Sequence, residues 1–142
     1  MTVVLDTNVV LQARAPGHEY HRILQGLLAG QFILAASTAI LLEYEEILTA
    51  RVGAARWQQF TAVLDAIGVS SGNIRQAEPS FRWRLIAADP DDDKFADCAI
   101  AAEADWIITE DAHFDGMKGS GHKPQPISPE DFIRRFLAAS ES

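Results

Sequence analysis

The chain has 142 residues, of which 48% are hydrophobic, and this length and composition fit one globular domain spanning residues 1–142. The single cysteine, Cys98, excludes an intrachain disulfide, as is typical of a reducing compartment. No apolar run approaches the roughly 18 residues that cross a bilayer, and the first run ends at Asp6 with no basic segment before it. We therefore expect a cytoplasmic protein that does not contact a membrane.

The formal net charge is −8, from 20 acidic and 12 basic residues. This charge argues against nucleic-acid binding through a broad basic face. The excess of acids serves either solubility or a group of carboxylates that holds cations. The positions of the acids along the chain decide between these two explanations.

The first elements are a strand, a turn, a helix and a second strand. Residues 2–5 form a short apolar run that predicts a buried strand, and residues 6–8 have turn and helix-capping chemistry. A helix with one apolar face is expected after His18 and ends at Gly30. Residues 32–35 then predict a second buried strand.

Two helices follow the second strand. Ser37 or Thr38 caps the first of them, and Gly53 separates it from the next, which Gly68 closes. Residues 69–88 mix turn residues with short apolar pieces, so only weak strands or loops are expected there.

The rest of the chain continues to alternate between helices and strands. In order, we expect an acidic turn at 89–93, a helix at 94–104, a strand at 106–109, a loop at 116–124, a short strand at 126–127 and a helix starting at Pro129. Such alternation predicts an α/β fold with a central, mainly parallel sheet and helices on both faces, which is a three-layer α/β/α sandwich.

Two acids directly follow predicted strands. Asp6 comes after the first strand, and Asp111 comes just after the strand at 106–109. Each one alone is an ordinary helix cap. Because ligands of parallel sheets bind beyond the carboxyl ends of the strands, two acids at this edge favour a binding site.

Two further acids have apolar neighbours. Glu43 lies between Leu42 and Tyr44 in a predicted helix, and Asp97 lies beside Cys98 in another. A lone buried carboxylate is costly unless it is paired or binds a metal. Both acids are therefore expected to point inward, whereas Cys98 is expected to be a small core residue.

The acidic turn does not fit a calcium-binding loop. Asp89, Asp91 and Asp93 match its first three ligand positions, but Lys94 stands where Gly is required and Ile100 where Glu is required. A plain acidic turn and helix cap is the expected structure. The histidines show no metal-binding spacing with a cysteine or an acid; they are His18, His21, His113 and His122.

Three segments together resemble the PIN-domain ribonucleases, in particular the toxin components of bacterial toxin–antitoxin pairs. They are VVLDTNVVLQA, STAILLEYEEIL and DPDDDKFADCAIAAEADWIITED, and the resemblance extends from Val3 to Asp115. Each motif alone is short, but their order and spacing in the strand context make the combination specific. The resemblance implies a PIN-like fold and hydrolysis of RNA phosphodiester bonds by a metal-dependent endoribonuclease.

The resemblance also implies which residues form the site. The acidic quartet of the family falls on Asp6, Glu43, Asp97 and Asp111, and Asp92 matches an additional metal-binding acid. Carboxylates suit hard ions, so Mg²⁺ or Mn²⁺ is the expected cofactor, with Asp6 and Asp97 as the main direct ligands. Four acids balance the charge of two divalent ions, although one ion is also compatible with the sequence.

Other residues are expected to support this site. Asn8 and Thr109 match supporting polar positions of the family, and Asp115 is an accessory acid. Arg14 and Lys94 are candidate phosphate contacts. The resemblance further implies an RNA substrate, a cognate antitoxin partner and a homodimer.

Two other functions compete with the ribonuclease. A haloacid-dehalogenase-type phosphatase also places an Asp after the first strand, but it needs a second Asp where this chain has Asn8. A non-catalytic RNA-binding or protein-interaction module on the same fold is the second alternative. Metal-dependent cleavage would exclude that module, and RNA binding without turnover would support it.

Overall fold

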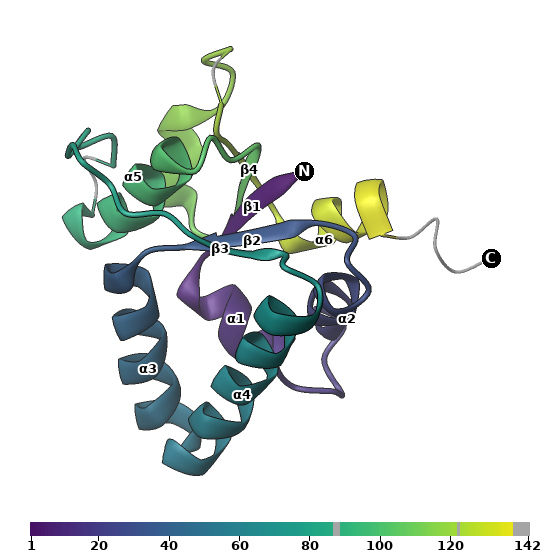
Figure 1. Cartoon of the computed structure of the whole chain (residues 1–142). Helices are drawn as coiled ribbons and strands as arrows, with labels where there is room; N and C mark the ends of the chain where they lie inside the picture. Colours follow the sequence, from purple (N-terminus) through teal and green to yellow (C-terminus); the bar gives the residue numbers. More distant parts are fainter. Residues whose placement is uncertain (87–88, 122, 138–142) are drawn as a thin grey trace.

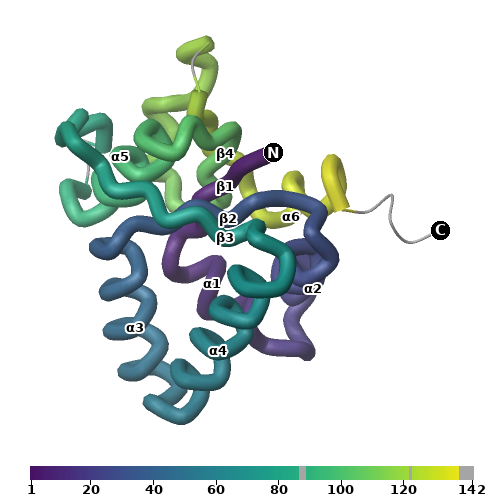
Figure 2. The backbone as a smooth tube through the Cα atoms, in the orientation of Figure 1, coloured from purple at the N-terminus to yellow at the C-terminus, as the bar shows by residue number. Residues whose placement is uncertain are grey.

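The computed structural model describes residues 1–86, 89–121 and 123–137, and it contains a parallel sheet with helices on both faces (Figures 1 and 2). Five strands form the sheet in the order β3-β2-β1-β4-β5, and every neighbouring pair is parallel. The strands are β1 (Thr2–Leu5), β2 (Ile33–Ala36), β3 (Ile74–Gln76), β4 (Trp106–Ile108) and β5 (Gln125–Ile127). The predicted α/β class is confirmed.

The helices divide between the two faces of the sheet. They are α1 (Thr7–Ala13), α2 (His21–Leu28), α3 (Thr38–Val52), α4 (Ala54–Ser70), α5 (Asp93–Ala101) and α6 (Pro129–Phe132). Short 3-10 turns, η1 (Pro90–Asp92) and η2 (Ala112–Met117), precede α5 and follow β4, and a π-helical turn, η3 (Ile133–Leu137), follows α6. Figure 1 shows α5 on one side of the sheet and α1, α3 and α4 on the other.

The central strand β1 is also the point where the strand order reverses. Val3 of β1 lies in register with Leu34 of β2 on one side and with Trp106 of β4 on the other. The chain first moves outward from β1 to β2 and β3, and then returns to the other side of β1 for β4 and β5. In open parallel sheets the crevice at such a reversal binds ligands at the carboxyl ends of the strands.

The core holds the site-bearing elements firmly against β1. Val3, Val4 and Tyr44 have no exposed surface, and the Tyr44 hydroxyl donates a hydrogen bond to the carbonyl of Leu5. This bond ties α3 to the end of β1 and satisfies a buried hydroxyl that would otherwise be costly. The side chains that follow β1 and those on α3 are therefore held close together.

The structure differs from the predicted elements at two places. Helix α1 begins at Thr7, directly after β1, where only a turn was expected, because Asp6 acts as its N-cap. Helix α4 continues through Gly68 to Ser70, since a single helical glycine costs only about 1 kcal/mol. The weakly predicted region at 69–88 contains strand β3, which pairs with β2.

Parts of the expected elements lie outside the described residues, namely 87–88, 122 and 138–142. Across the ranges that the structure describes, no helix is both long enough and apolar enough to span a membrane.

Candidate active site

Asp6 lies at the carboxyl end of β1 and is nearly buried, with 6% of its surface exposed. Its Oδ1 accepts a hydrogen bond from the backbone N–H of Thr7 at 2.7 Å, and its Oδ2 accepts one from the Thr109 hydroxyl at 2.7 Å. Burial raises the pKa of this carboxyl, the two hydrogen bonds oppose the rise, and the charges of Asp111 and Glu43 add to it. The protein thus holds Asp6 in place beside other acids.

Glu43 reaches the same place from α3. Its Oε2 accepts a hydrogen bond from the hydroxyl of Thr7, the residue after Asp6, and its Oε1 lies 2.5 Å from Nζ of Lys94. Helix α3 starts at the cap Ser37, whose Oγ accepts from the N–H of Ile40 at 3.2 Å. Glu43, which was expected to point inward, is half-buried and lies beside the residue that follows Asp6.

Asp111 and Asp92 approach from the other side of β1, with His113 between them. Nδ1 of His113 lies 3.2 Å from Oδ1 of Asp111 and 3.3 Å from Oδ2 of Asp92. The backbone N–H of Asp111 donates to the Thr109 hydroxyl at 3.0 Å, and that hydroxyl donates to Asp6. Thr109 therefore links two of the predicted acids, as its expected supporting role requires.

Asp92 belongs to the same group by its electrostatics. The pKa of its carboxyl is raised to about 7, first by burial, and also by a hydrogen bond to Asp111 and by the charges of Asp6 and Asp111. The hydrogen bond to His113 acts in the opposite direction. Four acids from four segments thus meet at the reversal point of the sheet, and we call them the acidic cluster: Asp6, Glu43, Asp92 and Asp111.

Asp97 is not brought into the acidic cluster. Its Oδ1 accepts a hydrogen bond from the backbone N–H of Trp83 at 3.0 Å, and its charged neighbours are Asp93 and Arg82. Asp92 and Asp97 are five residues apart, which places them about 140° apart around a helix. Asp97, expected beside Asp6 as a main ligand, thus lies against the segment that contains Trp83, and Asp92 is the acid of this region that lies near Asp6 and Asp111.

Asp97 and Asp93 instead share a face of α5 and hold a neighbouring segment. Oδ1 of Asp93 accepts from the backbone N–H of Ile86 at 2.9 Å, much as Asp97 accepts from Trp83. The two acids are four residues apart, the spacing that puts side chains on one helix face. Asp97 is buried and Asp93 is half-buried in this anchoring arrangement.

Three other predicted residues lie at the margin. Asn8 is exposed on the first turn of α1, and Asp115 is exposed and forms a salt bridge with Lys118 at 2.9 Å. Arg14 follows the last residue of α1 and so lies at the far end of that helix from Asp6. The structure does not bring Arg14 to the acidic cluster.

Comparison with known protein families shows which family this chain belongs to. The family described as PIN domain matches residues 2–113. The chain belongs to this family. No match to a curated protein was significant.

Solved structures share the fold of this PIN domain. VapBC2 from Rickettsia felis, bound to a DNA fragment from its promoter, superposes with a TM-score of 0.58 at 18% identity, covering 90% of this chain and 98% of that chain. VapC20 from Mycobacterium tuberculosis, described as a sarcin–ricin loop cleaving toxin, gives a TM-score of 0.54 at 14% identity, covering 84% of this chain and 95% of that chain. At these identities the likeness shows the fold alone.

His113 is the residue of this PIN domain that the sequence did not reveal. Asp89, Asp92 and His113 each offer a ligand atom, and these atoms lie within 4.8 Å of one another. His113 shows no metal-binding spacing in the sequence, but it lies beside Asp89 and Asp92 because η2 and η1, which are distant in sequence, are adjacent in space. Its position two residues after Asp111 was the only available signal. His122 lies outside the described residues.

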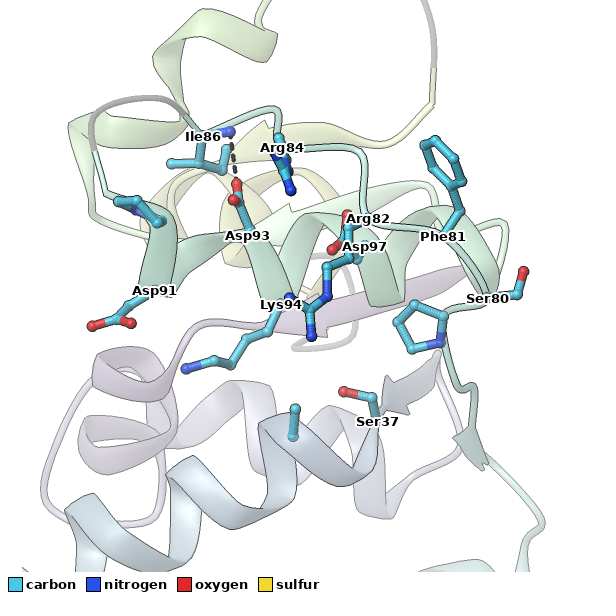
Figure 3. Close-up of a pocket in the computed structure, with 13 residues that line it drawn as sticks. Ser37, Ser80, Phe81, Arg82, Arg84, Ile86, Asp91, Asp93, Lys94 and Asp97 are labelled. Atoms are coloured by element: carbon cyan, nitrogen blue, oxygen red, sulfur yellow. Dashed lines mark hydrogen bonds between the residues drawn. The ribbon is translucent and has the colours of Figure 1, made fainter.

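A pocket of about 1040 Å³ lies next to the acidic cluster of the PIN domain (Figure 3). Arg82, Arg84, Lys94 and Asp97 are among its lining residues. Figure 3 shows Arg82 and Lys94 extending into the space between α5 and Ser37, which caps α3. Lys94 also pairs with Glu43, so one of the residues that line this pocket contacts the acidic cluster.

Proposed function

We propose that this PIN domain is a ribonuclease that hydrolyses RNA phosphodiester bonds with Mg²⁺ or Mn²⁺ bound by the acidic cluster. One observation carries the proposal: the carboxylates of Glu43, Asp92 and Asp111 surround the buried carboxylate of Asp6. Carboxylates that are buried this close to one another are unfavourable when all are ionised, and a divalent cation removes the repulsion.

The donor atoms suit such a cation. The cluster offers carboxylate oxygens, which hard ions such as Mg²⁺ and Mn²⁺ prefer. The pKa values of Asp6 and Asp92 are raised first by burial and then by the charges of neighbouring acids, and a bound cation would offset both effects. Asp6, Asp92 and Asp111 would hold the ion, with Glu43 as a further ligand. When bound, such an ion lowers the pKa of water and stabilises charge that develops on the phosphodiester.

The residues around the cluster keep it in position. Thr109 and the N–H of Thr7 fix both oxygens of Asp6, so the carboxylate cannot rotate away from its neighbours. Lys94 orients Glu43 and places a positive charge where the pocket meets the cluster, next to the expected path of a phosphate. Asp97 has an anchoring role and is not a ligand in this scheme.

Cleavage of RNA by the purified chain tests the proposal. With Mg²⁺ or Mn²⁺ present, the wild type is expected to cleave RNA, while the variant Asp6→Asn falls to background because it removes charge from the centre of the cluster. Circular dichroism checks that the variant is folded. Cleavage that persists in excess EDTA, or in the folded Asp6→Asn protein, would contradict the proposal.

The non-catalytic module makes the opposite prediction for the same assay. It predicts that the wild type binds RNA tightly and leaves it intact at every metal concentration. A haloacid-dehalogenase-type phosphatase would instead hydrolyse a generic phosphate monoester. The four acids of the cluster favour the nuclease over both alternatives.

We also propose that the chain acts in the cytoplasm as the toxin of a toxin–antitoxin pair. Support comes from the fold that it shares with VapC20, which is described as a toxin, and with VapBC2. Expression of the wild type is then expected to arrest growth of a bacterial host, and Asp6→Asn to relieve the arrest. Co-purification with the product of a neighbouring gene tests the antitoxin, and light scattering tests the homodimer.

A further inference from the structure

An exposed segment with alternating aromatic and cationic side chains lies above α5. We call residues 81–85 the aromatic strap; their sequence is Phe-Arg-Trp-Arg-Leu. Phe81, Trp83 and Leu85 are 61%, 49% and 46% exposed, although large apolar side chains are usually buried. The rings of Phe81 and Trp83 contact each other edge-on, with centroids 4.8 Å apart. Two aromatic faces thus form one exposed surface.

The aromatic strap is fixed to the body of the protein. Asp97 accepts a hydrogen bond from the N–H of Trp83, and Asp93 accepts one from the N–H of Ile86, which is 2% exposed. Both acids belong to α5, the helix that directly follows Asp92. The rings therefore stay exposed because the backbone is held, and their distance from the acidic cluster is set by one short helix.

The cations of the strap line the pocket beside α5. Arg82, Arg84 and Lys94 line the same pocket, and Lys94 also pairs with Glu43 of the acidic cluster (Figure 3). Within the described ranges, neither Arg82 nor Arg84 forms a salt bridge with a contact below 4 Å. Asp91, Asp93 and Asp97 line the same pocket, so it is near neutral in a chain of net charge −8, and the cations there offset a local share of the acids.

We propose that the aromatic strap binds unpaired RNA nucleotides and directs the strand to the acidic cluster. Bases stack on Phe81 and Trp83, phosphates contact Arg82 and Arg84, and the strand continues past Lys94 to Glu43. Every base has a stacking face, but only unpaired bases can present it to a side chain. The strap is therefore the element that would select unpaired over paired nucleotides, and this inference rests on the proposed ribonuclease function.

The charge pattern favours RNA over a protein as the ligand of the strap. A protein-docking patch would continue the apolar surface, whereas here each exposed ring alternates with an arginine and the adjoining pocket carries charged side chains. Aromatic rings with interleaved arginines along an extended segment match the stacking and phosphate contacts of single-strand binding. Lys94, which lines the pocket and pairs with Glu43, connects this surface to the acidic cluster, where a phosphodiester would be cleaved.

Binding of labelled RNA to the non-cleaving Asp6→Asn protein tests the inference. Fluorescence anisotropy would compare a short single-stranded oligoribonucleotide with a duplex of the same sequence. Adding Phe81→Ala and Trp83→Ala is expected to weaken single-strand binding by at least about tenfold, from the loss of two stacked bases. Adding Arg82→Ala and Arg84→Ala instead is expected to reduce the salt dependence of binding. The slope of the logarithm of the binding constant against the logarithm of the salt concentration should become shallower by about 1.4.

Matched controls separate these effects from general changes in charge or apolar surface. Leu28→Ala removes an exposed apolar side chain from α2. Arg51→Ala with Arg56→Ala removes two exposed cations, one from the last turn of α3 and one from the first turn of α4. Both controls should bind RNA like the parent. Thermal melting followed by circular dichroism confirms that each variant is folded.

The inference is overturned if the aromatic variant binds single strands like the parent, if the duplex binds as tightly as the single strand, or if the controls weaken binding equally. Loss of binding to a protein partner with RNA binding intact would assign the strap to that protein and also overturn it. Wild-type cleavage is measured in parallel. If the wild type cleaves RNA and the aromatic variant does so with unchanged KM, the strap inference fails while the proposed function stands.

A wild type that binds RNA through the strap without cleaving it would instead contradict the proposed function alone. A parent protein that does not bind RNA at all would contradict both.

Discussion

At the scale of single residues, Asp6 and Asp92 are the acids of the cluster whose pKa values are raised by their surroundings. Both are largely buried, and burial raises the pKa of each, to about 7 for Asp92. The pKa of His113 is also raised, first by its hydrogen bond to Asp92. The fold therefore retains protons on this group that the unfolded chain releases, and stability depends on pH for that reason.

We predict that the protein without divalent metal loses thermal stability as pH rises from 5 to 8. A carboxyl whose pKa is higher in the folded state favours folding below its unfolded pKa, and this contribution is lost as pH rises through the folded value. The raised pKa of His113 has the same sign. The measurement is the melting temperature in EDTA across this pH range.

Two comparisons sharpen this prediction. Asp92→Asn should flatten the pH dependence, whereas Asp65→Asn, which removes an exposed carboxylate on α4, should leave it unchanged. Mn²⁺ should raise the melting temperature most at pH 8, where the acids are ionised. A melting temperature that rises between pH 5 and 8 in EDTA would disprove this electrostatic account.

At the scale of elements, α5 and the turn before it serve two neighbours at once. Asp92 in η1 faces the acidic cluster, while Asp93 and Asp97 face the aromatic strap. The sequence predicted the helix but not which acid faces which neighbour, because the anchoring segment was expected only as loop or weak strand. A buried acid with small apolar neighbours fits a metal ligand and a backbone anchor equally well, and Asp97 was assigned to the metal from those neighbours together with the family resemblance.

We predict that Asp97→Ala releases the strap locally. A hydrogen bond from a backbone N–H to a charged group contributes about 1.5–3 kcal/mol, so its loss should accelerate amide exchange at Trp83 by at least about tenfold. Asp97→Asn retains an accepting oxygen and should change this exchange little. Hydrogen exchange measured by NMR or mass spectrometry gives the rates, with Asp91→Ala, an exposed neighbour, as the control.

Equal exchange at Trp83 in the wild type and in Asp97→Ala would show that Asp97 does not anchor the strap. The anchoring argument would then lose its basis, and Asp97 would again be open to a role at the metal.

At the scale of the whole molecule, topology explains which parts of the site could be predicted. Alternating apolar runs and helical patterns were enough to place Asp6 and Asp111 at one edge of a parallel sheet, because that edge collects the carboxyl ends of all strands. Glu43 was placed by its apolar neighbours and by the family resemblance. Contacts between η1 and η2, which unite Asp92 with His113, depend on loop conformations that local patterns do not encode.

The same limit applies to the elements themselves. Helix α1 was missed because its β-branched residues Val9 and Val10 have modest helix propensity, and they become helical through the Asp6 cap and through burial. Strand β3 is short and is defined by its pairing with β2 rather than by its own sequence. The conformations of α1 and β3 therefore depend on tertiary contacts, which local sequence patterns do not predict.

The central claim is that the acidic cluster, with Asp92 as its third aspartate, performs metal-dependent RNA cleavage. The most direct measurement compares the cleavage rates of Asp92→Asn and Asp97→Asn with that of the wild type, at saturating Mg²⁺ or Mn²⁺ and on one single-stranded RNA. The structure predicts that Asp92→Asn falls to background, since it alters the cluster, and that Asp97→Asn stays within a few-fold of the wild type. Loss of cleavage in Asp97→Asn with full activity in Asp92→Asn would contradict the account.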